Sequence, residues 1–330
     1  MGGAAGMAVA SHAADKALPT RVFGRSGARV TILAIGCGNR LWAAYKTEGR
    51  GVEALNLAYE SGIRYFDTAQ GYDNGTSETW VGKANKARRK EVFLASKTGA
   101  RKFDDVLRNS ELSLKRLQTD HLDVLHIHGL KDEADLDRIE KDGTVKALYR
   151  LRDEKIVRFI GITSHADPAA LAKAIERYDF DATQMALNAG LQGRSPDGGG
   201  YWKKGGPNDF FGEALPPKPY PGSSFEEVAL PVAVRKKLGV IAMKVTAQEG
   251  LIGDGPAKAD AGQLIRYAMS LPVSVVTVGM PKLDLIRQNT QLARSFKPMS
   301  EAERLELSRR LADANKMALD HHFNHEHRDA

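Results

Sequence analysis

The chain has 330 residues, 42% of them hydrophobic and 27% charged, which is enough material for one large α/β domain or two ordinary ones. Its single cysteine, Cys37, excludes an intramolecular disulfide and any metal centre built from several cysteines, and no apolar run approaches the ~20 residues of a membrane helix. The net charge is +7, but the basic residues are scattered among acidic ones, so we expect neither nucleic acid nor membrane as a partner.

Residues 1–17 are expected to form a flexible N-terminus or the remnant of a signal. They are rich in small apolar residues and contain no acidic residue before Asp15. This composition is typical of the sequence around a signal-peptide cleavage site. No basic region precedes this stretch and it has no twin arginine. We therefore expect a cytoplasmic protein, with export to the periplasm as the alternative if residues 1–14 are what is left of an export signal.

From Leu18 the chain begins with a predicted β-hairpin, Thr20–Phe23 and Arg29–Thr31, and then alternates regularly between strands and helices. Eight apolar strands are expected: Ile32–Ile35, Ile63–Phe66, Val92–Ala95, Leu122–Ile127, Val157–Ile162, Ala182–Ala186, Val240–Met243 and Val273–Val278. A helical pattern follows each of them: Gly51–Ser61, Ser77–Ala87, Phe103–Leu117, Asp135–Glu154, Pro168–Arg177, Phe225–Lys237, Ala261–Ser270 and Leu283–Arg294.

This alternation predicts a parallel sheet, and eight units are the number that closes a (β/α)8 TIM barrel. An open doubly wound sheet would also alternate, but the first strand–helix turn contains only Gly36-Cys37-Gly38 in place of a complete glycine-rich phosphate loop. The prediction is one barrel domain over residues 18–318, with the N-terminal hairpin and an extra C-terminal helix over Ser300–Met317.

Two segments stand outside the alternation. Residues 190–224 after the sixth strand are rich in Gly, Pro and aromatic residues, and we expect a long loop on the substrate side, or else a solvent loop pinned by its aromatics. Residues 319–330 contain several histidines; we expect a disordered polar tail, and opportunistic metal binding is the weaker alternative. No metal is expected in the functional site.

Titratable residues follow three consecutive strands. Asp67 and Tyr72 follow the second strand, Lys97 ends the third, and His126 and His128 end the fourth. A barrel gathers the C-terminal ends of its strands at one mouth, so these side chains are expected to share a pocket. Taken singly, Asp67 could be a helix cap, Lys97 a surface lysine and Tyr72 a loop-packing residue. Both histidines point inward if either does, and His128 lies nearer the mouth.

These motifs resemble the aldo-keto reductase family. The resemblance is carried by Phe66-Asp67-Thr68-Ala69 followed by Tyr72, by Ser96-Lys97, and by the leucine-rich strand 122–128 that closes at His128. It implies reduction of an aldehyde, ketone or sugar carbonyl to the alcohol by hydride transfer, with Tyr72 as proton donor. A phenol has an ordinary pKa near ~10, and a neighbouring cation such as Lys97 lowers it. Asp67 would hold Lys97, and His128 would position the substrate oxygen.

The resemblance also implies a nicotinamide dinucleotide, NADP(H) more than NAD(H), bound without a Rossmann fold. The residues expected to bind it are Thr163, Ser164, Gln184, Met243, Lys244, Gly279, Lys282, Gln288 and Asn289. Gly279 lets the backbone approach a pyrophosphate near a helix N-terminus, and Lys282 is placed for a 2′-phosphate. Ser164 stands where the family has Asn, and Met243 and Lys244 stand where it offers an aromatic ring.

Two other functions remain open from the sequence. One is a non-catalytic cofactor-binding subunit that senses redox state, as in some relatives of the family. The other, with less support, is an aldolase that forms a Schiff base on Lys97. A small carbonyl compound is the expected substrate, with Trp42, Tyr201 and Trp202 as candidates to line its pocket. The sequence does not specify the substrate or the oligomeric state.

Overall fold

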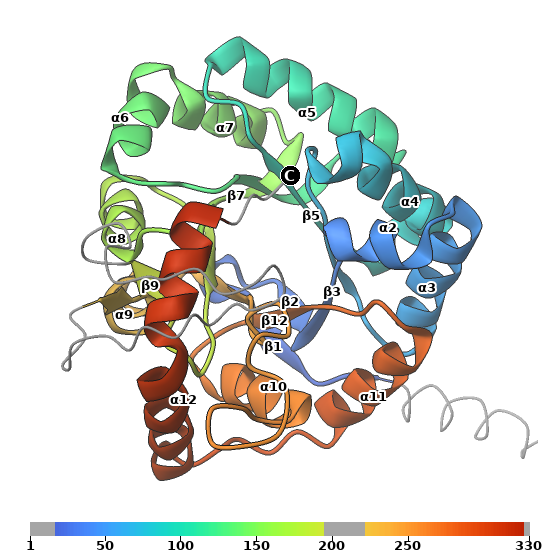
Figure 1. Ribbon diagram of the computed structural model, residues 1–330. Coiled ribbons are helices and arrows are strands. Elements are labelled where there is room, and N and C mark those ends of the chain that lie inside the picture. The colour runs from blue at the N-terminus through green and yellow to red at the C-terminus, as the bar shows by residue number, and fades with distance from the viewer. Residues whose placement is uncertain (1–16, 195–221, 327–330) are drawn as a thin grey trace, which may run out of the picture.

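A closed barrel of eight parallel strands organises the computed structural model, which describes residues 17–194 and 222–326 (Figure 1). The strands pair in chain order around the barrel, and β12 closes it by pairing with β3. They are β3 (Leu33–Gly36), β4 (Tyr65–Asp67), β5 (Phe93–Thr98), β6 (Leu122–Ile127), β7 (Val157–Ser164), β8 (Ala182–Ala186), β11 (Gly239–Met243) and β12 (Val275–Gly279). The predicted (β/α)8 fold is confirmed.

Helices surround the barrel as an outer layer in Figure 1. They are α2 (Asn39–Tyr45), α3 (Glu48–Glu60), α4 (Thr76–Asn85), α5 (Phe103–Leu117), α6 (Glu133–Lys141), α7 (Thr144–Asp153), α8 (Pro168–Arg177), α9 (Phe225–Arg235), α10 (Ala261–Ser270) and α11 (Leu283–Arg294). In the described part of the chain, every helix is too short or too polar to span a lipid bilayer.

Two details of the helices differ from the prediction. The helix expected over Asp135–Glu154 is two helices, because Gly143 adopts a left-handed φ of 82° between α6 and α7. That conformation suits glycine and cannot continue a right-handed helix. The short helix α2, directly after β3, was not predicted; it brings Asn39 and Arg40 to the mouth of the barrel.

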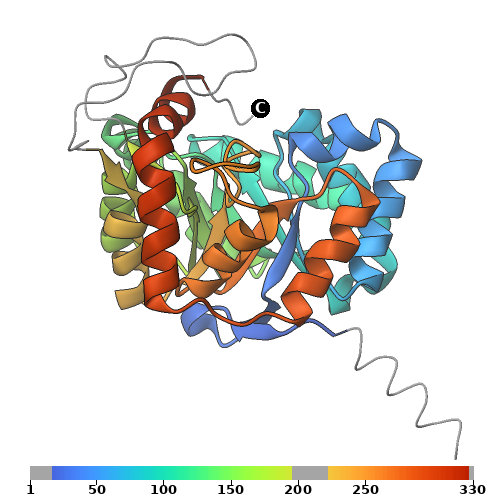
Figure 2. The ribbon, with the colours of Figure 1, turned by 60° about the horizontal axis from the view of Figure 1, so that its bottom comes forward.

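The N-terminal hairpin closes the bottom of the barrel (Figure 2). Strands β1 (Thr20–Val22) and β2 (Arg29–Thr31) pair antiparallel as predicted. Phe23 between them is fully buried, and its ring centroid lies 5.1 Å from that of Phe93 and 6.3 Å from that of Tyr65. The lower interior is therefore aromatic and apolar.

The helix α12 (Glu301–His321) runs along the outside of the barrel from the hairpin end to the mouth (Figure 2). Ser300 and Glu303 form a capping box at its start, which satisfies two backbone donors. The chain after 318, expected as a polar tail, continues this helix and then a π-helical turn, His322–Glu326. Leu319 and Phe323 are buried there, so apolar packing extends the fold beyond the expected boundary.

The long segment after β8 has paired ends. Its first residues form β9 (Gly193–Arg194), which pairs antiparallel with β10 (Ser223–Ser224) just before α9. Asp320 of α12 accepts a hydrogen bond from the backbone of Gly193 at 2.7 Å, so the C-terminal helix is joined to the base of this segment. The candidate pocket residues Tyr201 and Trp202 lie outside the described residues.

Candidate active site

A buried ammonium group lies at the centre of the polar mouth. Lys97 Nζ donates to Asp67 Oδ1 at 2.6 Å and to the carbonyl oxygen of Thr68 at 2.8 Å, and the Tyr72 hydroxyl lies 3.5 Å away. The Lys97 side chain is 1% exposed. The strands β4 and β5 are neighbours in parallel register, so they bring the carboxylate and the ammonium together as the strand-end pattern predicted.

The fourth titratable residue, His128, stands against the phenol. It follows the last residue of β6, and its ring meets the Tyr72 ring almost at a right angle with centroids 5.5 Å apart. Asp67, Tyr72, Lys97 and His128 therefore form one cluster at the C-terminal ends of the strands. An ammonium beside a phenol favours the phenolate, and an imidazole beside it can hydrogen-bond an oxygen bound between them.

His126 lies one layer deeper, as its place in the strand suggested. Its side chain is fully buried, and neither ring nitrogen has a hydrogen-bond partner among the described residues. Burial lowers the pKa of His126 well below its usual range, and the nearby charges of Lys97 and His128 lower it further. This favours the neutral form of the His126 imidazole.

The His126 ring depends on a glycine of the next strand. A Cβ atom at Gly161 would lie 2.3 Å from His126 Nδ1 and 2.6 Å from the carbonyl oxygen of Ala182. We predict that Gly161→Ala lowers the free energy of unfolding by about 1–3 kcal/mol through overpacking, measured by urea denaturation. Gly99→Ala is the control, because a Cβ there meets nothing within 4 Å. Equal stability of the two variants would contradict this packing.

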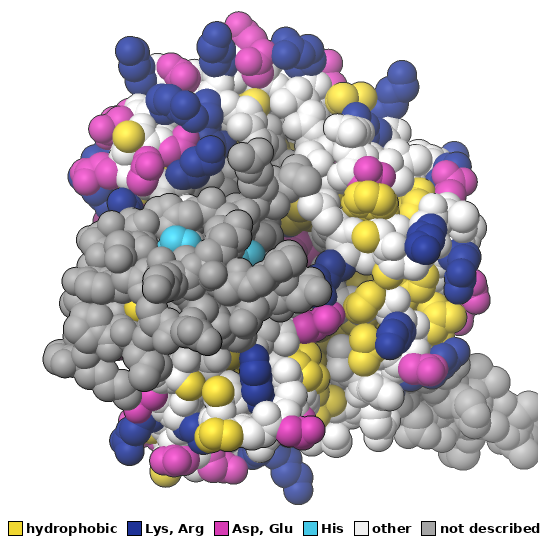
Figure 3. Space-filling model, in the orientation of Figure 1, with side chains coloured by type: hydrophobic (Ala, Val, Ile, Leu, Met, Phe, Trp, Pro, Cys, Tyr) yellow, Lys and Arg dark blue, Asp and Glu magenta, His cyan; other side chains and the backbone are white. Residues whose placement is uncertain are grey.

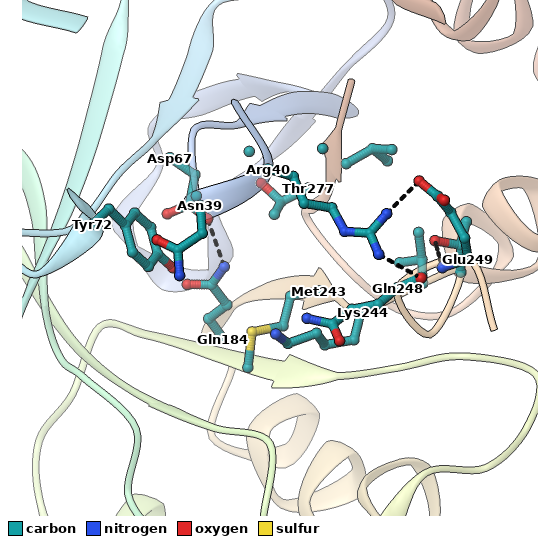
Figure 4. Close-up of a pocket in the computed structure, with 16 residues that line it drawn as sticks. Asn39, Arg40, Asp67, Tyr72, Gln184, Met243, Lys244, Gln248, Glu249 and Thr277 are labelled. Carbon is teal, nitrogen blue, oxygen red and sulfur yellow. Dashed lines mark hydrogen bonds and ion pairs between the residues drawn. The ribbon is translucent and has the colours of Figure 1, made fainter. Parts of the chain in front are cut away.

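A cavity of about 170 Å³ opens beside Tyr72 (Figure 4). Asp67, Tyr72 and Gln184 lie at one end of it, and Met243 and Lys244 form part of its wall. Gln184 Nε2 donates to Asp67 Oδ2 at 2.7 Å, while its Oε1 atom is buried without a hydrogen-bond partner in the described structure. An amide oxygen in that position can accept a hydrogen bond from a ligand that enters the cavity.

An ion pair bridges the other end of the cavity. Arg40 of α2 pairs with Glu249 and donates to the carbonyl oxygen of Gln248 at 2.8 Å, so the loop after β11 is tied to the helix after β3 (Figure 4). Lys244 and the stretch 247–249 have left-handed φ values between 49° and 75°. Sequence reading missed both partners, because a bond between residues 209 positions apart leaves no local pattern.

The remaining predicted cofactor residues divide into three groups. Met243, Lys244 and Gly279 line the cavity with Gln184. Thr163 and Ser164 are buried beside it but do not line it: Thr163 Oγ1 accepts from the backbone of Gly129 at 2.8 Å, and Ser164 Oγ donates to the carbonyl oxygen of Leu130 at 2.7 Å.

The third group belongs to α11, outside the cavity lining. Lys282 precedes the helix and is exposed, as is Gln288, whereas Asn289 is buried at 9% exposure.

Trp42, a candidate for the substrate pocket, is half-buried on α2 and packs against the hydrophobic core. Its indole Nε1 is buried with no hydrogen-bond partner among the described residues.

Charges of both signs are interspersed on the described part of the face that carries the mouth (Figure 3).

The basic run at residues 86–90 also has partners within the protein. Arg89 pairs with the buried Asp123 at 2.9 Å, and the Arg88 guanidinium lies 4.0 Å over the Tyr59 ring. Arg88 and Arg89 therefore make stabilising contacts within the protein.

Comparison with known proteins agrees with this architecture. Residues 34–195 match the model of the Aldo/keto reductase family. The chain is 25% identical over 306 residues to the uncharacterized oxidoreductase YqkF of Bacillus subtilis, covering 83% of this chain and 91% of that protein. It is 34% identical over 154 residues to L-galactose dehydrogenase of Arabidopsis thaliana, a match that covers 43% of this chain and 47% of that protein.

Solved structures show the same fold. The holo form of aldo-keto reductase AKR11C1 from Bacillus halodurans superimposes with a TM-score of 0.68 at 22% identity, covering 92% of this chain and 99% of that one. An aldo-keto reductase from Klebsiella pneumoniae in complex with NADPH gives a TM-score of 0.65 at 22% identity. The match covers 91% of this chain and 97% of that one. The protein therefore belongs to the aldo/keto reductase family.

Proposed function

We propose that the protein is an NADP(H)-dependent reductase that converts an aldehyde, ketone or sugar carbonyl to the alcohol. One observation carries the proposal: the Tyr72 hydroxyl stands 3.5 Å from the buried ammonium of Lys97 at the wall of a cavity. Carbonyl reduction needs a proton on oxygen, and a phenol held beside a cation is equipped to give one.

The residues around the cavity fit a nicotinamide cofactor. The unpartnered Oε1 of Gln184 suits the amide N–H of a carboxamide, and Met243 offers an apolar surface for a ring. Gly279 has no atom within 4 Å of its Cβ direction, so a phosphate group can approach its backbone. The solved Klebsiella pneumoniae relative is in complex with NADPH, which supports the phosphorylated form, and Lys282 is the residue we assign to its extra phosphate.

In the proposed reaction the cofactor, when bound, supplies a hydride to the carbonyl carbon. Tyr72 donates its proton to the carbonyl oxygen as negative charge develops there. Lys97 stabilises the resulting phenolate, and Asp67 keeps Lys97 charged and directed at the phenol. His128 hydrogen-bonds the substrate oxygen and holds it against Tyr72. General acid catalysis contributes about 10²–10⁴-fold, so orienting the two reactants must supply much of the acceleration.

A regulatory role is the second candidate, because one relative is named a putative voltage-gated potassium channel subunit beta. That protein, from Schizosaccharomyces pombe, is 34% identical over 136 residues, 36% of this chain and 38% of its own. The Schiff-base alternative is disfavoured by the contacts of Lys97. Its Nζ atom is buried and donates hydrogen bonds to a carboxylate and to a carbonyl oxygen, so it is engaged as a donor, whereas a Schiff base needs the amine as a nucleophile.

A substrate panel tests the proposal. Aldehydes, ketones and aldoses would be incubated with the protein and either NADPH or NADH, and oxidation of the cofactor followed by absorbance. We expect turnover with NADPH and a lower dissociation constant for NADPH than for NADH. Tight NADPH binding without turnover of any compound would overturn catalysis in favour of regulation. Trapping of a substrate on Lys97 by borohydride would overturn it in favour of the aldolase.

A further inference from the structure

Tyr72 stands in a turn that the backbone alone does not favour. The 3-10 turn Tyr72–Gly75 includes Asp73 at φ 46° and Asn74 at φ 52°, followed by Gly75 at φ 95°. Non-glycine residues in the left-handed region cost free energy and persist where surrounding contacts hold them. The position of the phenol therefore depends on whatever braces this turn.

Arg116 braces it from the last turn of α5. Its Nη2 atom donates to the carbonyl oxygen of Asn74 at 2.9 Å, and its Nη1 atom lies 3.5 Å from that of Gln70. These carbonyls belong to the residues two positions after and two positions before Tyr72. The guanidinium also covers Gly75, where a Cβ atom would lie 2.1 Å from the Arg116 Cζ atom. One rigid fork thus spans the turn that presents the phenol.

A buried carboxylate ties Arg116 to the strand that carries the ammonium. Glu78 of α4 is fully buried, and its Oε2 atom lies 3.5 Å from Arg116 Nη1. Its Oε1 atom accepts from Ser96 Oγ at 2.6 Å, and Ser96 directly precedes Lys97 in β5. Burial raises the pKa of Glu78, while hydrogen bonds from Ser96 and Ser113 and the charge of Arg116 lower it. The Glu78 Oε2 atom has no hydrogen-bond partner among the described residues, so its link to the partly exposed Arg116 guanidinium is an ion pair.

We infer that Arg116 and Glu78 are positioning residues that keep the Tyr72 hydroxyl within reach of the Lys97 ammonium. The connection runs from Lys97 to Ser96 along the strand, through Glu78 to Arg116, and through the two carbonyl groups to the turn. Neither residue lines the cavity, so they act on the reaction through the relative placement of Tyr72 and Lys97. The inference rests on the proposed function of Tyr72 as proton donor.

Several charged or titratable groups lie beside the phenol or around the cavity that it lines, and the test must hold them constant. They are Asp67 of β4, Lys97 of β5, His128 after β6, Asp73 in the turn, Arg116 of α5, and Arg40, Lys244 and Glu249 around the cavity. Replacing Arg116 by lysine leaves the charge of every one of them unchanged. An effect of that variant therefore reports geometry and not net charge.

The central variant is Arg116→Lys. An ammonium can pair with Glu78 but cannot reach both carbonyls with one planar fork. We expect kcat for carbonyl reduction to fall about 10–10²-fold, as for a small misplacement of a reacting group, with an unchanged dissociation constant for NADPH. The turn should carry Tyr72 away from Lys97, so the phenol keeps its proton to higher pH. The high-pH decline of kcat should accordingly move to higher pH.

Two further variants complete the design. Arg108→Lys is the matched control, since Arg108 lies on the same helix in an exposed pair with Asp105 and should change nothing. The double variant Arg116→Met with Glu78→Gln removes both charges together, so no buried charge is left unpaired if Arg116→Lys folds poorly. It should show the same fall in kcat and the same shift of the pH profile.

A direct measurement separates this inference from the proposed function. Tyrosine labelled with ¹³C at Cζ would be titrated by NMR, with the Tyr72 resonance assigned by its loss in Tyr72→Phe. We expect the Tyr72 resonance to titrate at higher pH in Arg116→Lys than in the wild type. An unchanged titration and an unchanged kcat profile would overturn the positioning role. Wild-type turnover in Tyr72→Phe would instead remove the proposed function, and the titration would still decide whether Arg116 holds the phenol.

Discussion

Replacing Tyr72 with phenylalanine is expected to reduce the rate of carbonyl reduction by about 10²–10⁴-fold, the contribution of a general acid. The variant removes only the hydroxyl that lies 3.5 Å from Lys97 Nζ, and it keeps the ring that packs against His128. NADPH should therefore bind with an unchanged dissociation constant. The measurement is kcat with an accepted carbonyl substrate, together with a fluorescence titration of NADPH.

The pH dependence of the rate provides a second test of this variant. The wild-type rate should fall as the pH rises and the phenol loses the proton that it must donate. The phenylalanine variant has no such proton, so its residual rate should lack this decline. Tyr178→Phe is a suitable control, because this tyrosine is half-buried against the ring of Phe180 on the outer side of the barrel. A Tyr72→Phe enzyme with near-normal turnover would remove Tyr72 from the mechanism.

Lys97→Met is expected to damage both stability and activity. It leaves the carboxylate of Asp67, which is 4% exposed, without its cation, and among the described residues Gln184 is then its remaining side-chain hydrogen-bond donor. Breaking a buried pair by removing one partner costs about 3–5 kcal/mol. The proposed proton donor also loses the cation that favours its ionised form. We therefore expect a lower urea midpoint and loss of measurable reduction.

The double variant Lys97→Met with Asp67→Asn separates the two effects. An amide at position 67 carries no charge to be stranded, so most of the lost stability should return. Activity should stay absent, because the phenol still lacks its cation. Recovery of activity with recovery of stability would mean that the pair is structural and has no part in the chemistry.

Local pattern was enough to predict the barrel and the residues at its mouth. Apolar strands alternating with amphipathic helices define the fold, and inward-facing strand ends place Asp67 and Lys97 side by side. The same reasoning placed His126 below His128. These are features that each segment encodes by itself, and the barrel geometry then brings them together.

The parts that were missed depend on distant contacts or on special backbone conformations. The break between α6 and α7 follows from the left-handed φ of Gly143, which a helical period does not reveal. The ion pair between Arg40 and Glu249 joins the helix after β3 to the loop after β11, across 209 positions of the sequence. Arg116 looked like one more charged residue on a helix, and only the fold shows that it spans the turn of Tyr72.

A crystal structure of the protein in complex with NADP⁺ would test the central claim most directly. We predict that the nicotinamide ring occupies the cavity next to Tyr72, with its carboxamide hydrogen-bonded to Gln184 and its reactive carbon facing the Tyr72 hydroxyl. A nicotinamide ring bound outside this cavity, or turned so that its reactive carbon faces away from Tyr72, would contradict the proposal.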